Sequence, residues 1–72
     1  MSPIQFIRKQ LFSVSQSEFA AILDVSQSTV SRWERGVSPS LDEMSKIRCA
    51  AVERGVSWSD SFFFDVPNGM AR

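Results

Sequence analysis

Apolar residues recur along the chain at intervals of three and four, the spacing that places side chains on one face of an α-helix. Three such stripes are Ile4, Ile7 and Leu11, then Phe19, Ala20 and Leu23, then Val30 and Trp33. A fourth contains Leu41, Met44, Ile47 and Ala51. Short polar or glycine-containing breaks separate the stripes at 12–15, 24–26, 36–39 and 55–57. The pattern therefore predicts a chain of short amphipathic helices.

Serines mark the expected start of each helix. In a capping box, the serine hydroxyl accepts a hydrogen bond from the backbone amide three residues later. The acidic or amide side chain of that later residue accepts one from the backbone amide of the serine. Such pairs are SPIQ, SQSE, SLDE and SWSD, which begin at Ser2, Ser15, Ser40 and Ser57. Ser26 begins SQST, which lacks the acidic residue but keeps the capping serine. These serines predict five short helices.

The second and third predicted helices are joined by only a few residues, at 24–26. A turn this short forces two helices to cross steeply, as in a helix-turn-helix. We therefore predict an all-α domain over residues 1–66 with a central helix-turn-helix, followed by a loose tail at 67–72.

The segment SDSFFFDVP leaves two structures open. It extends a helix from Ser57, or it forms a strand over 60–66 that ends before Pro67. In a helix, three consecutive phenylalanines cover too wide an arc for one face. In a strand, they occupy both faces. At least one of these rings should therefore contact a surface other than its own core.

Composition narrows the classes of function. The 72 residues allow one small domain. One cysteine, Cys49, and no histidine argue against a disulfide, a zinc site and the commonest general base. We expect that the protein is not an enzyme and that it uses no cofactor or small-molecule substrate. The sequence has no paired carboxylates with a base, no nucleophile set and no glycine loop. No apolar run approaches the ~18 residues of a membrane span, and the start lacks a signal-peptide core, so we expect a cytoplasmic protein with no membrane partner.

The stretch SQSEFAAILDVSQSTVSRWERG, at 15–36, resembles the helix-turn-helix of phage Cro and lambda-type repressors. In that family a glutamine opens the second helix, as Gln16 does, and a small residue lies where the helices touch, as Ala20 does. The apolar residues that lock the pair are matched by Phe19, Leu23, Val25, Val30 and Trp33. The resemblance covers roughly residues 4–47 and implies a lambda-repressor-like five-helix domain that binds DNA.

Three features depart from the family pattern. Asp24 stands where the turn usually has a glycine with a left-handed backbone, a conformation that Asp tolerates better than most residues. Arg48 stands where a small apolar residue is usual. The segment CAAVERG lengthens the fourth helix by about one turn. The family's dimer contacts are therefore not carried over to this chain.

The third predicted helix has a polar side suited to reading bases. Val30 and Trp33 face inward, which leaves these candidate base-reading residues on the outer side: Gln27, Ser28, Ser31 and Arg32. In the major groove, Gln can bond an adenine edge and Arg a guanine edge, and Ser is short enough to let the backbone approach. The alternative is a solvated polar face; the surrounding family motif favours base reading.

Helix starts bind anions through free amides and the positive end of the helix dipole. The candidate phosphate contacts at or beside helix starts are Gln16, Ser17, Ser38 and Ser40, and Arg35 is a further candidate that reaches outward from the end of the third helix. For the serines the alternative is simple capping, which is compatible with phosphate contact. The resemblance also places a basic residue of the first helix against the Glu of WERG, which predicts Lys9 and Glu34 as a partly buried structural pair.

The net charge of zero limits the affinity for DNA. Residues 1–39 hold Arg8, Lys9, Arg32 and Arg35 against Glu18, Asp24 and Glu34. Because affinity comes largely from cations that replace counterions, one domain should bind weakly. A weak homodimer would double the contacts and read two half-sites. The expected dimer contact is Phe62, Phe63 and Phe64, with core filling as the alternative for each ring.

The leading prediction is a sequence-specific transcription regulator of double-stranded DNA, a Cro-type phage or prophage repressor that binds a two-fold symmetric operator as a dimer. One alternative is the antidote half of a toxin–antidote pair, in which the Phe segment grips the toxin. Another is a protein-interaction module that has the same fold but no longer binds DNA. The neutral charge favours this last alternative, and the polar third helix opposes it.

Overall fold

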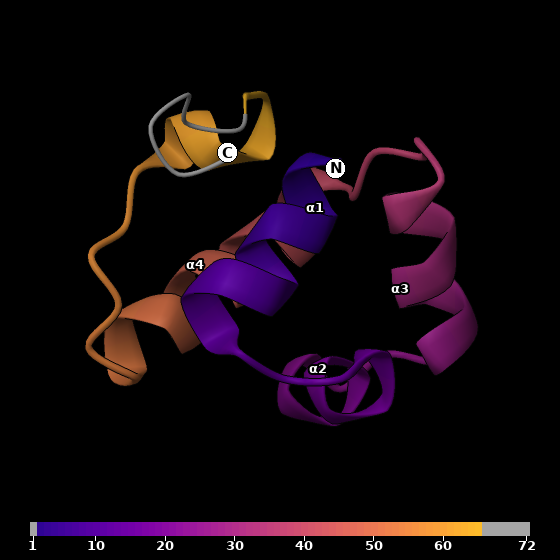
Figure 1. The fold of residues 1–72 in the computed structure, drawn as a ribbon, viewed down its shortest axis with the longest axis horizontal. Helices are drawn as coiled ribbons and strands as arrows, with labels where there is room; N and C mark the ends of the chain where they lie inside the picture. The colour runs from indigo at the N-terminus through magenta and orange to yellow at the C-terminus, as the bar shows by residue number, and fades with distance from the viewer. Residues whose placement is uncertain (1, 66–72) are drawn as a thin grey trace.

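The structure is a computed structural model that describes residues 2–65, and it is helical throughout its regular elements (Figure 1). In chain order the elements are α1 (Pro3–Phe6), η1 (Ile7–Phe12), α2 (Gln16–Leu23), α3 (Gln27–Glu34), α4 (Leu41–Glu53) and η2 (Asp60–Phe63). The predicted all-α fold is confirmed over this part of the chain. The strand alternative for 60–66 is wrong, because Asp60–Phe63 forms a 3-10 helix. The predicted tail at 67–72 lies outside the described residues.

Four of the predicted capping serines start helices. The Ser2 hydroxyl accepts from the amide of Gln5, and the Ser26 hydroxyl accepts from that of Thr29. Ser15 and Ser40 form complete capping boxes with residues three further on. The local sequence thus sets where α1, α2, α3 and α4 begin.

The fifth predicted cap is wrong by two residues. The cap of η2 is Ser59, whose hydroxyl accepts from the amide of Ser61, whereas Ser57 precedes the helix. Asp60 does not reach back to Ser57, because its two carboxylate oxygens accept hydrogen bonds from Trp58 and Arg48.

The turn between α2 and α3 has the left-handed residue that the family resemblance implies. Asp24 has φ 57° and ψ 47°, and the amide of Val25 donates to the carbonyl of Ala20 at 3.0 Å. This arrangement satisfies the carbonyls at the end of α2 within a few residues. In Figure 1, α2 is seen nearly end-on while α3 runs up the view, so the two helices cross steeply.

The core lies between the helices, with the continuous α1–η1 segment and α4 through the middle of the molecule (Figure 1). η1 is a π-helical stretch that continues α1. The largest fully buried side chains are Phe6, Phe19, Ile7, Ile47 and Val30. Ala20 is buried in α2, as expected for a residue at a helix crossing.

Leu41 departs from its expected place in the apolar stripe of the fourth helix. It is exposed, whereas Ile47, Ala50 and Ala51 form the buried side of α4. At 3.6 residues per turn, Leu41 lies about a third of a turn away from Ile47. None of the helices within residues 2–65 is both long and apolar enough to cross a membrane.

Candidate nucleic-acid interface

The third helix is fixed by its cap and its buried side. Ser26 accepts from the amide of Thr29, and the hydroxyls of these two residues are 2.8 Å apart. Val30 is fully buried and Trp33 almost so. These contacts determine which way α3 is rotated, and they leave Gln27, Ser28 and Ser31 on its outer side.

A shallow polar hollow of about 300 Å³ lies between the start of α2 and α3. Its lining residues are Gln16, Gln27, Ser28, Ser31 and Arg35. The structure thus brings three of the four candidate base-reading residues together with two of the candidate phosphate contacts. The hollow presents amides, hydroxyls and one guanidinium on the outer surface, which are the groups that bond base edges and phosphate oxygens.

The other candidates lie outside this hollow. Arg32 is exposed, and its Nη2 lies 3.5 Å from the hydroxyl of Thr29, on the flank of α3. Ser17 is exposed at the start of α2. Ser38 lines a different hollow, beside Trp33 and Gly36 at the far end of α3. The hydroxyl of Ser40 accepts from the amide of Glu43, so capping accounts for this serine without DNA.

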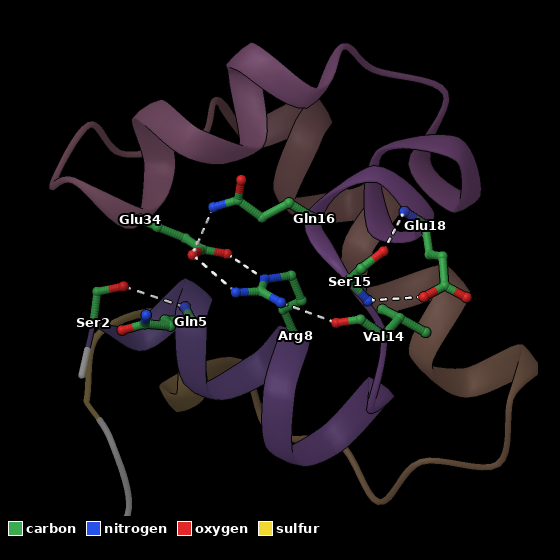
Figure 2. Close-up of polar contacts among 8 residues, drawn as sticks. All are labelled: Ser2, Gln5, Arg8, Val14, Ser15, Gln16, Glu18 and Glu34. Carbon is green, nitrogen blue, oxygen red and sulfur yellow. Dashed lines mark hydrogen bonds and ion pairs between the residues drawn. The ribbon is translucent and has the colours of Figure 1, made fainter.

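The basic partner of Glu34 is Arg8, so the predicted pairing with Lys9 is wrong. Nε of Arg8 donates to one carboxylate oxygen of Glu34, and Nη2 donates to the other at 3.1 Å (Figure 2). The remaining terminal nitrogen, Nη1, donates to the carbonyl of Val14 at 3.0 Å. Lys9 is exposed on the next position of the helix. The pair therefore ties the first helix to the end of α3.

Gln16 joins this network from the start of α2. Its Nε2 donates to Oε1 of Glu34 at 3.1 Å (Figure 2). Burial of the carboxyl tends to raise the pKa of Glu34, but several effects together outweigh burial and place it below its ordinary value. In decreasing order they are the hydrogen bonds from Arg8 and Gln16, then the positive charges of Arg8 and Lys9. Glu34 is therefore an anion held next to Gln16, one of the residues that line the polar hollow.

The resemblance implies only that a basic residue of the first helix pairs with Glu34, and position on the helix distinguishes Arg8 from Lys9. Arg8 lies four residues after Ile4 and four before Phe12, so its side chain shares the buried face of the helix. Lys9 lies one residue further on and points away from that face. A buried position within an apolar stripe is the signal that would have selected Arg8.

The three phenylalanines that were expected to form a dimer contact have different surroundings in the structure. Phe62 packs edge-on against Phe6, with ring centroids 5.8 Å apart, and also contacts Trp58. Phe63 packs against Trp58 with centroids 5.1 Å apart. Phe64 is largely exposed. Phe64 also contacts Phe63, with ring centroids 6.5 Å apart, but it is the most exposed of the three rings and so the most available to another surface.

The buried ion pair also changes the charge available to DNA. Arg8 and Glu34 neutralise each other inside the molecule. The cations of residues 2–39 that remain exposed are Lys9, Arg32 and Arg35. Few phosphate contacts are therefore offered by one copy of the chain.

The comparisons with known proteins add one positive finding. Residues 4–50, well over half of the chain, match a protein-family model described as "Helix-turn-helix". The match contains η1, α2 and α3 and most of α1 and α4. No curated protein and no solved structure matches the chain.

Proposed function

The chain belongs to the Cro- and lambda-repressor-like helix-turn-helix family, and from that premise we propose that it reads a specific double-stranded DNA sequence with the outer side of α3. The family is one of DNA-binding regulators and not of enzymes. The polar hollow between α2 and α3 is the observation that carries the proposal. Its residues come from two helices that the buried apolar side chains hold at a steep crossing.

In the proposed complex, α3 enters the major groove with its first turns against the bases. Gln27 and Ser28 stand at its start, and Ser31 follows one turn later on the same side. Gln27 has the donor and acceptor needed for an adenine edge. Arg32, on the flank, reaches a further base position, and its guanidinium suits guanine.

Phosphates flank the groove, and the proposed contacts to them lie on both sides of the hollow. Gln16 and Ser17 open α2, where amide groups and the helix dipole favour an anion. The amide of Gln16 is already oriented by Glu34, so little freedom is lost when it meets a phosphate. Arg35 provides the charge within the hollow. Ser38 and Ser40 remain proposed contacts near the start of α4.

We further propose that the protein is a Cro-type phage or prophage repressor that acts as a dimer on a two-fold symmetric operator in the cytoplasm. The small number of exposed cations supports this proposal, because one copy would bind DNA weakly at physiological salt. Two copies on adjacent half-sites combine their contacts, and the symmetry of the dimer requires a matching symmetry in the DNA.

Selection from a pool of random duplexes tests the proposal directly. We expect the full chain to enrich a two-fold symmetric sequence whose half-sites are about one helical turn apart. Replacing Gln27 with alanine should then weaken binding to the selected site by roughly five- to 150-fold and relax the choice at one base position. Gln10→Ala is the matched control, since Gln10 is an exposed glutamine outside the hollow.

Two results would count against the base-reading role. Gln27→Ala could weaken binding equally on selected and random duplexes, which would make Gln27 a contact without sequence information. Alternatively, no sequence could be enriched at all. That second result would favour the protein-interaction module or a contact with a toxin, for which the neutral net charge is no obstacle.

A further inference from the structure

The hydroxyl of Thr29 lies between two other polar side chains on one flank of α3. Its oxygen is 2.8 Å from the hydroxyl oxygen of Ser26, the residue that caps α3, and 3.5 Å from Nη2 of Arg32. The three residues are spaced by three, so they form a line along the helix. At 3.6 residues per turn, Thr29 lies on the side of Arg32 that is away from the polar hollow. The hydroxyl thus contacts a proposed base reader without itself lining the hollow.

The cap of α3 does not need this hydroxyl. The Ser26 hydroxyl accepts from the backbone amide of Thr29 at 3.2 Å, a bond that is available to any side chain at residue 29 except proline. In α2 and α4 the residue at the same position is a glutamate, Glu18 or Glu43, whose carboxylate accepts from the amide of the capping serine. In α3 a neutral threonine takes that place, and its hydroxyl lies beside Arg32 instead.

A glutamate at residue 29 would act against Arg32. A carboxylate three residues before an arginine in a helix pairs with it, so the positive charge that Arg32 offers to DNA would be neutralised. A hydroxyl accepts a hydrogen bond from a guanidinium but carries no charge. Threonine is also β-branched, which restricts the rotation of its side chain in a helix. Thr29 can therefore orient Arg32 and leave its charge intact.

The directions of the hydrogen bonds fit this role. Arginine has donors only, so the Thr29 oxygen accepts from Arg32. The Thr29 proton is then free to bond the Ser26 oxygen, at a distance typical of an O–H···O bond. The bond from Arg32 is long, so it biases the guanidinium towards this flank rather than locking it there. It uses one of the five N–H groups of the guanidinium, and the others remain free for a base edge.

We propose that Thr29 is a positioning residue for Arg32, which holds the guanidinium on the flank of α3 and so fixes the base position that Arg32 reads. This inference rests on the proposed function, because Arg32 is one of its base readers. Arg32 is exposed, and an unrestrained arginine side chain adopts many rotamers. Some of them turn towards the hollow, where Gln27 and Ser28 lie. Thr29 keeps Arg32 apart from these two readers.

Selection from random duplexes tests this role with four proteins, which are the wild type, Arg32→Ala, Thr29→Val and Thr29→Ser. Valine has the shape of threonine but lacks the hydroxyl, whereas serine keeps it. We expect Arg32→Ala and Thr29→Val to relax the choice at the same base position and to leave the position read by Gln27 unchanged. Thr29→Val should weaken binding to the wild-type site by about two- to tenfold, because one long side chain must then be ordered on binding. Thr29→Ser should select and bind as the wild type does.

Two further measurements separate positioning from a purely structural effect. Thermal melting shows whether each variant is folded, and Thr29→Val should melt close to the wild type because the backbone amide still bonds Ser26. In the background of Arg32→Ala, Thr29→Val should cause no further loss of affinity, since the side chain that it positions is absent. A loss that persists in that background, or that affects every base position alike, would overturn the inference.

The remaining outcomes distinguish this inference from the proposed function. If Arg32→Ala relaxes one base position and a folded Thr29→Val does not, the inference fails and DNA reading stands. The same conclusion holds if Thr29→Ser loses selectivity as fully as Thr29→Val. If Arg32→Ala relaxes no position while Gln27→Ala does, Arg32 is not a reader, so the inference fails and reading by α3 stands. If the wild type enriches no sequence, the proposed function fails and the inference fails with it.

Discussion

Replacing Arg8 with methionine should remove a large part of the stability of this small domain. Methionine keeps the apolar stem but leaves the Glu34 carboxylate with Gln16 as its remaining hydrogen-bond donor. The side chains of Arg8 and Glu34 are only 10% and 7% exposed, so water cannot replace the guanidinium. Breaking a buried pair from one side costs about 3–5 kcal/mol. A domain of this length is stable by roughly 4–11 kcal/mol in total.

Urea unfolding followed by circular dichroism at pH 7 measures this loss. Arg48→Met is the matched control, because it breaks the Arg48–Asp60 pair, whose side chains are 49% and 60% exposed. We expect that control to cost at most about 1 kcal/mol. The double variant Arg8→Met with Glu34→Leu should recover most of the stability, since an apolar pair needs no compensating charge.

The pH dependence of the same experiment gives a second signature. Without Arg8, burial should raise the pKa of Glu34, and the folded variant should take up a proton as the pH falls. The stability difference between wild type and Arg8→Met should therefore shrink as the pH is lowered from 7 towards 4. A cost below about 1 kcal/mol at pH 7, or a difference that does not change with pH, would refute the assignment of a buried, charged pair.

Four further predictions concern the same fold. The wild type should lose stability in urea as the pH falls below the ordinary Glu pKa of 4.5, because the pKa of Glu34 is lowered in the folded state and its contribution is lost on protonation. Ala20→Leu should cost about 1–3 kcal/mol by overpacking, whereas Ala21→Leu, exposed on the same helix, should change the melting temperature little. Asp24→Val should cost about 1–3 kcal/mol in urea unfolding, since a β-branched residue is strained at φ 57°, and Asp24→Gly should not show this loss. With three exposed cations in residues 2–39 on each chain, the plot of log affinity against log salt should have a slope no steeper than about −3 for one chain and −5 for two; a much steeper slope would mean that cations elsewhere contact DNA.

The sequence by itself predicted the features that depend on residues close together in the chain. The caps of α1, α2, α3 and α4 join groups three residues apart, so SPIQ, SQSE, SQST and SLDE were sufficient to place those helix starts. The burial of Val30 and Trp33 followed from apolar spacing, and the left-handed backbone at Asp24 was implied by the family resemblance. These features determine the helix-turn-helix and the side of α3 that faces out.

Contacts between distant segments were decided only by the tertiary structure. Arg8 and Glu34 are 26 residues apart. Apolar spacing indicates that Arg8 lies on the buried face of the first helix, but only the packing shows that Glu34 lies against that face. Arg48, 12 residues before Asp60, donates a hydrogen bond to its carboxylate, which is therefore not available for the predicted cap at Ser57. The exposure of Leu41 and the separate surroundings of Phe62, Phe63 and Phe64 depend on how α4 and η2 are placed. The physical reason is that a hydrogen bond within one turn depends on neighbouring residues alone, whereas the partner of a long side chain depends on the rotation of a helix, which the whole core sets.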